Sequence, residues 1–393
     1  MGTTVGVGFS DHRNPLKAGE EAVERALTQA AIMRPDFVLV FATVGYKQEA
    51  LLNAIRKASG GAPVSGCSGE GVITHETATE SNFGVSVMVF CSDELRFERF
   101  LIEDISDSAA AGETLASQLN SVAAGDSLAC LLFADGLAFN FDPFINSFKR
   151  CLALPLPVFG GLAADNWTSR KTYQYHDDLV LSDGLSCILI SGQGRLSWGV
   201  SHGCIPVGSE RTVTKSRENI IQEIDGTPAL SALQGYFSEG WQEQWSKASL
   251  NLCLGFPAPT EIKGEYGEHV IRYMPSKNDQ DGSVTIQSEV AEGTRFWIVR
   301  RDKELIRKGL CEVSEKISQD FSGQKPKFIL QFECSGRGKV VFREQEKNDL
   351  IRSLQQEVGA NVPWLGFYTY GEIAPVGGLN CFHNFTSVIL AVI

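Results

Sequence analysis

An arginine between two glycines is the residue whose surroundings most favour ligand recognition. Arg337 lies in the segment Cys334-Ser335-Gly336-Arg337-Gly338, which follows an apolar run at residues 328–332. The glycines leave room around the side chain, and a guanidinium grips a carboxylate through two parallel hydrogen bonds. We therefore predict that Arg337 binds the carboxylate of a small ligand. The alternative is a structural ion pair with Glu372 or Glu70, and the sequence does not decide between the two.

Four more candidates follow apolar runs that are typical of β-strands. In α/β proteins, ligands favour the loops at the carboxyl ends of strands. Such loops carry the residues that complete the predicted ligand site: Cys67, Glu70, Cys334 and Glu372. A cysteine acts as a nucleophile only when a neighbouring base makes it a thiolate, and no histidine lies near either cysteine in the sequence. Small buried thiols are the favoured interpretation, and we expect a binding protein rather than an enzyme.

The histidines raise the separate hypothesis of a bound cofactor. The chain has six, and no two of them have the spacing of a zinc site. His202 lies in an apolar, strand-like segment at residues 198–204, and a lone imidazole on an apolar wall can serve as an axial haem ligand. His202 is therefore the predicted iron ligand, with His383 in reserve. The commoner outcome for such a histidine is a structural role.

A pattern that occurs three times is expected to position these loops. Each copy begins with an apolar strand, continues with a helical face and a Pro-x-x-Gly segment, and closes with a second apolar strand. The three copies occupy residues 37–90, 130–190 and 328–393, and their Pro-x-x-Gly segments are 63–66, 157–160 and 363–366. The shared proline and glycine favour related modules over a chance succession of elements. We predict an α/β fold with mixed sheets built from three repeated β-α-β-β modules, and tight glycine turns in equivalent places.

The remaining segments complete the expected organisation. Residues 4–9 and 23–30 predict an N-terminal strand and an amphipathic helix. Residues 196–207 predict a strand or strand pair, residues 219–233 a helix, and residues 260–300 strands and hairpins with a turn at Asp281-Gly282. The clearest division falls near Gly226, which gives domains at residues 1–225 and 226–393.

Composition excludes several classes of function. The chain has 393 residues, with 47 acidic and 35 basic side chains and a net charge of −12, which argues against general binding of nucleic acid or anionic lipid. No apolar run approaches the ~20 residues that span a bilayer, and the first residues lack the pattern of a secretory signal. The ten cysteines include no Cys-x-x-Cys pair. We therefore expect a cytoplasmic protein without a membrane anchor.

Several landmarks together resemble the FIST family, whose name stands for F-box and intracellular signal transduction. The N-terminal half is suggested by Gly66-Cys67-Ser68, by Phe159-Gly160-Gly161-Leu162-Ala163-Ala164-Asp165 and by His202-Gly203-Cys204-Ile205-Pro206-Val207-Gly208. The C-terminal half is suggested by Asp225-Gly226-Thr227-Pro228-Ala229-Leu230, by Cys334-Ser335-Gly336-Arg337-Gly338 and by the segment 366–373. The resemblance covers roughly residues 28–393, and its weight comes from six motifs in order rather than from any one of them.

What the resemblance implies is signal transduction rather than a named reaction. Two FIST half-domains are expected to bind a small ligand, with amino acids among the family's proposed ligands, and one bacterial branch of the family binds haem and senses nitric oxide. The first expectation is therefore a sensor with haem b on His202 or His383, which regulates a separate histidine kinase or cyclic-di-GMP enzyme. The alternatives are a haem-free sensor of an amino acid or small carboxylate, and an enzyme that uses Cys67 or Cys334. The ligand, the partner and a homo-oligomeric state stay open.

Overall fold

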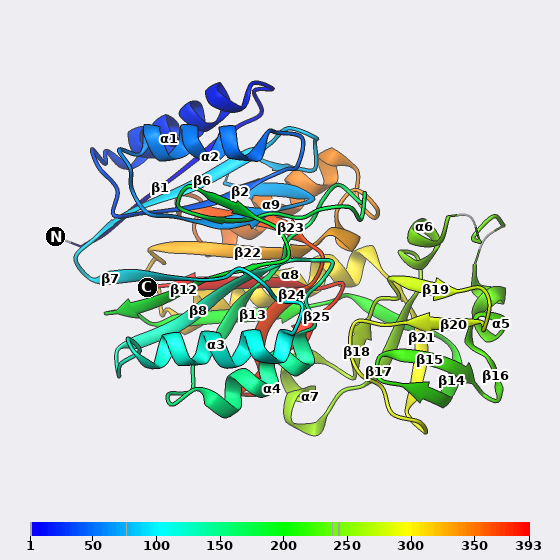
Figure 1. Ribbon diagram of the computed structural model, residues 1–393. Helices are drawn as coiled ribbons and strands as arrows, with labels where there is room; N and C mark the ends of the chain where they lie inside the picture. Colours follow the sequence, from blue (N-terminus) through cyan, green and yellow to red (C-terminus); the bar gives the residue numbers. More distant parts are fainter. Residues whose placement is uncertain (1, 76, 238, 243) are drawn as a thin grey trace.

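Three six-stranded sheets enclose one apolar core, and an eight-stranded sheet lies at one end of them (Figure 1). The computed structural model describes residues 2–75, 77–237, 239–242 and 244–393. The strand orders are β1-β6-β2-β3-β10-β11, β7-β12-β8-β9-β24-β25 and β13-β26-β22-β23-β4-β5. In each sheet the third and fourth strands run parallel and the other neighbours run antiparallel. The three sheets and their helices form what we call the body.

Each sheet is built mainly by one module of the chain. The first module comprises β1 (Thr3–Ser10), α1 (Pro15–Ala30), β2 (Phe37–Ala42), α2 (Gln48–Ala58), β3 (Val64–Ser68), β4 (Gly71–Thr74), β5 (Ala78–Thr79) and β6 (Val85–Ser92). The second comprises β7 (Leu95–Ile102), α3 (Ser108–Asn120), β8 (Ser127–Ala134), α4 (Phe141–Cys151), β9 (Val158–Leu162), β10 (Gln174–His176), β11 (Leu179–Leu181) and β12 (Leu185–Gly192). The third comprises β13 (Leu196–Ser201), α8 (Lys303–Asp320), β22 (Phe328–Cys334), η2 (Ser335–Arg337), α9 (Glu344–Val358), β23 (Trp364–Thr369), β24 (Glu372–Val376), β25 (Leu379–His383) and β26 (Ser387–Val392).

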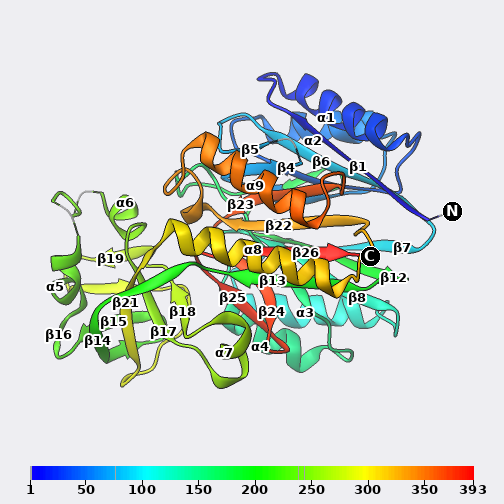
Figure 2. The ribbon, with the colours of Figure 1, turned by 180° about the vertical axis from the view of Figure 1, so that it is seen from behind.

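The shared order of elements confirms the predicted threefold repeat and extends it. Every module has a further strand and helix before the predicted unit: β1 and α1, β7 and α3, β13 and α8. The N-terminal strand and helix, which we predicted as a segment outside the three repeats, are therefore the start of the first module. Two helices per module cover the outer face of its sheet, as α8 and α9 show from behind (Figure 2).

The repeated glycines lie inside strands rather than in turns. Gly66, Gly160 and Gly366 are each the third residue of their strand, and each faces a residue of the parallel neighbour. A Cβ on any of them would overlap the carbonyl oxygen of that neighbour: Val40, Leu132 or Gln331. The prediction of equivalent places is confirmed, whereas the prediction of tight turns is wrong. Close approach of two backbones is the reason for these glycines.

The inner faces of the three sheets meet in a core rich in phenylalanine. Near the carboxyl ends of their strands, the rings of Phe41, Phe133, Phe332 and Phe367 contact one another, with centroids 4.3–6.1 Å apart. Each buried ring contributes about 1.5–3 kcal/mol relative to an exposed one. The core therefore fixes all three sheets relative to one another and brings their carboxyl ends together.

Hairpins are exchanged between the modules in a cycle. The hairpin β4–β5 of the first module pairs with β23 of the third, β24–β25 of the third pairs with β9 of the second, and β10–β11 of the second pairs with β3 of the first. Every sheet of the body is thus completed by residues from another module.

The eight-stranded sheet is an insertion between β13 and α8 of the third module. Its elements are β14 (Cys204–Arg217), β15 (Ile220–Ile224), β16 (Thr227–Pro228), α5 (Ala229–Leu233), η1 (Gln234–Tyr236), α6 (Trp245–Ser249), β17 (Cys253–Pro257), α7 (Thr260–Tyr266), β18 (His269–Arg272), β19 (Ser276–Asn278), β20 (Ser283–Thr285) and β21 (Arg295–Arg301). We call residues 204–301 the inserted unit. It lies at the end of the body opposite the two chain termini (Figure 1).

Within the inserted unit, one sequence prediction is corrected and two are confirmed. The helix predicted over residues 219–233 begins as the strands β15 and β16, and only α5 at its end is helical. Residues 196–207 hold two strands as predicted, β13 and the start of β14, although the two lie in different sheets. Asp281-Gly282 is the turn between β19 and β20. The proposed division at Gly226 falls in the turn between β15 and β16, inside the eight-stranded sheet, and the domain boundary stays a prediction. Among the described residues, none of the helices has the length and apolar character that crossing a membrane requires.

Candidate functional site

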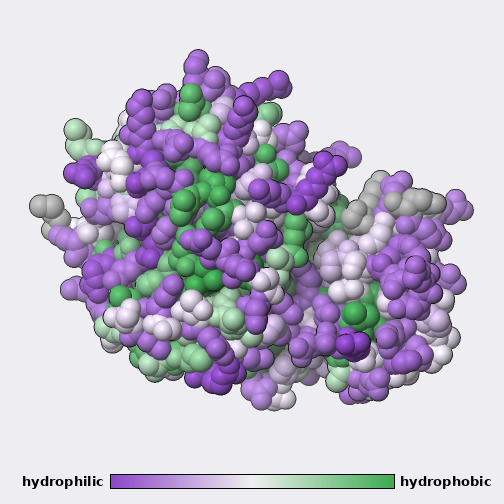
Figure 3. Space-filling view, in the orientation of Figure 1, coloured by the Kyte–Doolittle hydropathy of each residue, from purple (hydrophilic) through white to green (hydrophobic). Residues whose placement is uncertain are grey.

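A small cavity lies where the inserted unit meets the carboxyl ends of the body strands. It has a volume of about 100 Å³, and we call it the boundary cavity. From the body it is lined by Gly136, Leu137, Trp167, Ser169, Cys334, Ser335, Gly336, Tyr370, Asn384 and Phe385, and from the inserted unit by Leu250, Tyr273, Pro275 and Gln287. Figure 3 shows a hollow between the body and the inserted unit on one face of the molecule. Crevices at the carboxyl ends of strands are the usual place for ligands in such sheets.

A buried aspartate shapes the loop that presents Trp167 to this cavity. The carboxylate of Asp165 accepts hydrogen bonds from the backbone of Ser169, Arg170 and Lys171 at 2.6–3.0 Å, and from the Tyr370 hydroxyl at 2.8 Å. Although burial opposes it, these hydrogen bonds hold the pKa of Asp165 below its ordinary value. The carboxylate therefore stays ionised and fixes the loop.

The same loop stores backbone strain beside the cavity. Asn166, Trp167 and Ser169 have φ between +50° and +59°, a conformation that side chains rarely adopt. The backbone N–H of Trp167 donates to the Tyr370 hydroxyl at 2.7 Å, and the two rings lie 5.2 Å apart. Such strain persists only where the surroundings enforce it, and it is frequent at ligand sites. The Asp165 and Tyr370 contacts are the enforcing groups here.

Polar contacts hold the inserted unit over the cavity. Asn384 accepts from the backbone N–H of Tyr273 at 3.1 Å and donates to the Gln287 side chain at 2.8 Å. Arg301 donates to the carbonyl groups of Gly336 and Leu250, and its guanidinium lies 5.3 Å from the centre of the Phe385 ring. Two small apolar clusters also cross the border: Leu250 and Ile271 share one with Cys334 and Phe385, and Ile262 and Tyr266 share the other with Val376.

Of the five predicted ligand residues, Cys334 lines the cavity and Glu372 lies beside that cysteine. Glu372 is fully buried and binds the side chains of Thr369 and Thr386. Burial raises its pKa to about 8, so it is protonated at neutral pH. Burial also raises the pKa of the Cys334 thiol well above its ordinary value, and the nearby Glu372 adds to that shift. Both groups are uncharged in this environment.

Arg337 is buried and turned away from the cavity. Its side chain is 0% exposed and forms an ion pair with Glu333 at 2.9 Å, instead of the Glu372 or Glu70 pair that the sequence offered as the alternative. It also donates to the carbonyl groups of Ser201 and His202. Arg337 does not line the cavity, although its Nη2 atom is buried without a hydrogen-bond partner among the described residues. These contacts favour a structural role, and the role in ligand recognition stays a prediction.

The other two predicted ligand residues lie apart from the cavity lining. Cys67 is fully buried in the body core, where desolvation raises its pKa well above the ordinary value. Glu70 is also buried, and it forms an ion pair with Lys339 at 2.7 Å and lies 3.4 Å from the Tyr370 hydroxyl. Burial raises the pKa of Glu70 to about 7 in spite of that lysine. The predicted convergence of Arg337, Cys334, Glu372 and Cys67 in one pocket is therefore not what the structure shows.

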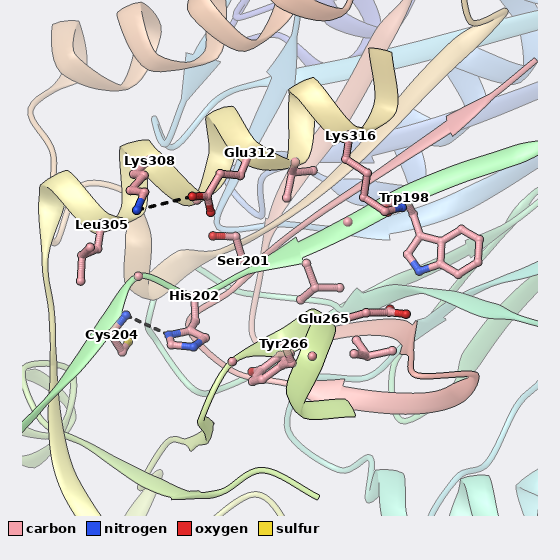
Figure 4. Close-up of a pocket in the computed structure, with 18 of the residues that line it drawn as sticks. Trp198, Ser201, His202, Cys204, Glu265, Tyr266, Leu305, Lys308, Glu312 and Lys316 are labelled. Carbon is pink, nitrogen blue, oxygen red and sulfur yellow. Dashed lines mark hydrogen bonds and ion pairs between the residues drawn. The ribbon is translucent and has the colours of Figure 1, made fainter. Parts of the chain in front are cut away.

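His202 lies in a different depression, an open groove between β13, α7 and α8 (Figure 4). The groove is larger than the boundary cavity, with a volume of about 560 Å³. Its charged side chains already have partners: Lys308 pairs with Glu312 at 3.6 Å, and Lys316 with Asp320 at 3.2 Å. Size alone would favour the groove over the boundary cavity, but its lysines are paired within the protein. Among the described polar atoms of its lining, the buried Tyr266 hydroxyl has no hydrogen-bond partner.

Neither candidate histidine fits an axial haem ligand in this arrangement. The Nδ1 atom of His202 accepts from the backbone N–H of Cys204 at 2.9 Å, and a hydrogen bond to the Tyr266 backbone occupies the ring further. Burial and the charge of Arg337 lower the pKa of His202 to about 4. His383 is 1% exposed, its Nε2 lies 3.1 Å from the Ala374 carbonyl oxygen, and its ring stacks on Tyr266. Neither histidine is therefore assigned as an iron ligand, and the haem cofactor stays a prediction.

The residues that build the cavity were mostly missed at the sequence level. Asp165 was visible only as the end of the motif at residues 159–165, and Trp167 was not singled out. The signal that existed was an acidic residue shortly after an apolar strand, followed by a large aromatic residue. The cavity itself depends on segments far apart in the chain, which only the fold brings together.

Comparison with known proteins gives relatives along the whole chain. An uncharacterized protein of Mycobacterium tuberculosis is 25% identical over 389 residues, covering 98% of each chain. An uncharacterized protein of Mycobacterium bovis is 24% identical over 388 residues, covering 98% of this chain and 97% of that one. An uncharacterized protein of Methanocaldococcus jannaschii is 22% identical over 226 residues, which is 56% of this chain and 41% of that one.

Solved structures are only remotely similar. A chorismatase structure aligns over 100% of this chain and 99% of its own, with 9% identity and a TM-score of 0.36. A cyanuric acid hydrolase covers 49% of this chain and 69% of its own, with 13% identity and a TM-score of 0.30. At these scores the similarities carry no argument about mechanism.

Two domain families account for most of the sequence. The FIST N domain matches residues 36–227, and the FIST C domain matches residues 229–375. Together the matches span far more than half of the chain, and the α/β architecture with three mixed sheets agrees with the fold expected from the resemblance. The chain therefore belongs to the FIST family, with a FIST N domain followed by a FIST C domain.

Proposed function

We propose that this FIST protein is a small-molecule sensor whose ligand binds in the boundary cavity. The observation that carries the proposal is the shared lining, because Tyr273 and Gln287 of the inserted unit face the same space as Trp167 and Tyr370 of the body. A ligand that contacts both sides contributes binding free energy only in the arrangement that brings the two together. Binding thereby changes how the inserted unit sits on the body.

The connections between the two units give such a change a route outwards. The chain leaves the body at residues 201–204 and returns at 301–303, and the backbone N–H of Asp302 donates to the Gly203 carbonyl at 2.9 Å. Arg337 binds the outgoing connection through the Ser201 and His202 carbonyl groups, and it belongs to the same short helix as the cavity residues Ser335 and Gly336. A shift of that helix is therefore passed directly to the joint.

The state of the thiols favours a sensor over an enzyme. Burial raises the pKa of Cys67 and of Cys334 well above the ordinary value, which keeps both thiols protonated. A protonated thiol is a poor nucleophile. The cysteine-dependent enzyme is thus the weaker proposal.

The signal is proposed to pass to a separate protein, with a histidine kinase or a cyclic-di-GMP enzyme as the partner class that the family resemblance implies. Haem-based sensing of nitric oxide is the finer form of that expectation. The hydrogen-bonded rings of His202 and His383 do not favour it, and the boundary cavity is far too small for a porphyrin. The proposed ligand of the boundary cavity is therefore a compact molecule rather than haem.

A fragment screen tests the location of the site. Saturation-transfer NMR of the full chain is carried out with a library of one-ring fragments, using the wild type and the variants Leu137→Trp and Leu179→Trp. Leu137 lines the cavity and is 45% exposed, whereas Leu179 is 48% exposed and lies on β11. Binding is expected in the wild type and in Leu179→Trp, and to be lost in Leu137→Trp. Fragments that bind all three proteins equally would remove the cavity as the sensing site.

Hydrogen exchange then tests the signal. A bound fragment is expected to slow amide exchange at residues 202–204 and 301–303, because both connections are held between the two units. Unchanged exchange there, with a fragment bound, would show that occupancy does not reach the joint.

A further inference from the structure

We infer that the boundary cavity selects an uncharged, single-ring aromatic compound that carries a hydrogen-bond acceptor, an inference that rests on the proposed function. Four aromatic side chains provide much of the lining: Trp167, Tyr273, Tyr370 and Phe385. Tyr273 and Phe385 approach each other edge to face at 5.9 Å, across the border between the inserted unit and the body. Flat apolar rings of this kind favour a flat apolar ligand.

The charge of the lining excludes ionised ligands. Among the described residues that line the cavity there is no Asp, Glu, Lys, Arg or His. The nearest charged groups are already engaged, since Arg301 binds the Gly336 and Leu250 carbonyl groups and Asp165 is saturated by its own loop. A carboxylate or ammonium group would lose its hydration without gaining a partner, which opposes binding strongly.

One buried donor requires an acceptor. The indole Nε1 of Trp167 is buried and has no hydrogen-bond partner within the described protein. An unmade hydrogen bond of this kind is costly, so a ligand that offers a carbonyl oxygen or a ring nitrogen is favoured there. The Gln287 side chain accepts from Asn384 through its oxygen, which leaves its amino group to donate to a second acceptor.

The volume sets the size of the ligand. The cavity of about 100 Å³ is of the same order as an engineered cavity of ~150 Å³ in another protein that binds benzene. One ring with a small substituent fits this space, whereas a fused tricycle or a porphyrin does not. The cavity thus argues against both expectations from the sequence, haem and a carboxylate read by Arg337.

Three probes of nearly equal size separate these requirements. Benzamide is neutral and carries a carbonyl acceptor, benzoate is an anion, and benzylammonium is a cation. Isothermal titration of the full chain with each probe is expected to give an affinity for benzamide at least tenfold higher than for either ion. Trp167→Phe keeps a ring but removes the indole N–H. This variant is expected to lower the affinity for benzamide about tenfold and to leave the affinity for benzoate unchanged.

Each outcome has a separate meaning. The ligand class would be overturned if an ion bound more tightly than benzamide, or if Trp167→Phe bound benzamide as well as the wild type does. The proposed site would still stand in that case, provided that Leu137→Trp abolishes binding of the same probe. Benzamide binding that survives Leu137→Trp would instead overturn the proposed site itself. No binding of any of the three rings would also overturn the inference, because the cavity is argued to accept a single ring. A far-ultraviolet circular dichroism spectrum shows that each variant is folded.

Discussion

The body and the inserted unit are held together by different means. In the body, every sheet contains strands from two modules, and one phenylalanine core joins all three sheets. The inserted unit has its own small core around Val213, Ile221 and Phe296. It meets the body through two small apolar clusters, through directional polar contacts such as those of Arg301 and Asn384, and through two neighbouring connections.

The contrast assigns different roles to the two regions. A body with interlocked sheets resists deformation, because a change in one sheet must disturb the other two. The inserted unit shares two small apolar clusters and a few hydrogen bonds with the body but, within the described residues, exchanges no strand with its sheets, so it can shift at smaller cost. A cavity at the border between them is therefore placed where ligand binding has the largest structural effect.

The largest expected effect concerns the joint between the two regions. Arg337→Met removes the ion pair with the buried Glu333 and the contacts to the Ser201 and His202 carbonyl groups. Leaving that carboxylate unpaired is expected to lower the free energy of unfolding by about 3–5 kcal/mol in urea titrations. Arg352→Met is the control, because its pair with Asp349 is more than half exposed and is expected to change stability by less than about 0.5 kcal/mol. Equal effects would mean that Arg337 does not fix the joint.

Two glycine substitutions, one in the body and one in the inserted unit, compare how tightly the backbone is packed in the two regions. Gly366→Ala brings a Cβ against the Gln331 carbonyl in the body, and a loss of about 1–3 kcal/mol or more is expected. Gly264 lies exposed in α7 with open space around the position of a Cβ, so Gly264→Ala is expected to stabilise by about 0.5–1 kcal/mol. Thermal unfolding of both variants measures the difference. A neutral Gly366→Ala would show that the parallel strands of the body can separate without cost.

The buried carboxyl of Glu372 predicts a pH dependence of the body. The folded chain keeps this proton up to a pKa of about 8, whereas the unfolded chain releases it near the ordinary value of 4.5. Between those pH values the unfolded state binds fewer protons, so the free energy of unfolding falls by up to about 1.4 kcal/mol per pH unit as the pH rises. Above about pH 8 both states release the proton and this contribution becomes constant.

Replacing the carboxyl isolates that contribution. Glu372→Gln is expected to flatten the fall in stability between about pH 5 and 8, as measured by urea titrations at a series of pH values. Glu312→Gln, at an exposed position beside the groove, is the matched control and should follow the wild type. Parallel curves for Glu372→Gln and the wild type would show that Glu372 is ionised in the folded state.

The smallest expected effect concerns the groove near His202. Because hydrogen bonds to the backbone engage its ring, mixing haemin with the wild type and with His202→Ala is expected to give the same visible spectrum. A Soret band that appears in the wild type and is lost in the variant would contradict this geometry. It would also move the sensing site from the boundary cavity to the groove.

The sequence predicted the repeated architecture well because the signal is local. A proline and a glycine three residues apart mark each module, and their cause, a close approach of two parallel strands, acts within the module itself. The helix predicted at residues 219–233 failed because Ile220, Ile221 and Ile224 have a spacing that suits a helix face. As β-branched residues they pack in β15 between two other strands instead.

The candidate site was predicted only in part because it depends on long-range contacts. Cys334 was identified through its place at the end of a strand. The partner of Arg337 is Glu333, four residues earlier, which directly follows the predicted strand at residues 328–332. Its selection depends on the burial of both groups. The cavity also needs the inserted unit, and no single sequence motif predicts that this unit packs over the carboxyl ends of the body strands.

The cyclic exchange of hairpins has a consequence for how the chain is made. A ribosome releases the β4–β5 hairpin long before its partner β23 exists, and the edge of β9 stays open until β24 is synthesised. The last strand, β26, then enters the middle of its sheet between β13 and β22. A chain cut short in its last quarter therefore exposes unpaired strand edges in two sheets at once, which favours aggregation over partial folding. The two FIST domains of this protein depend on each other for their sheets, because each supplies strands that the other's sheets contain.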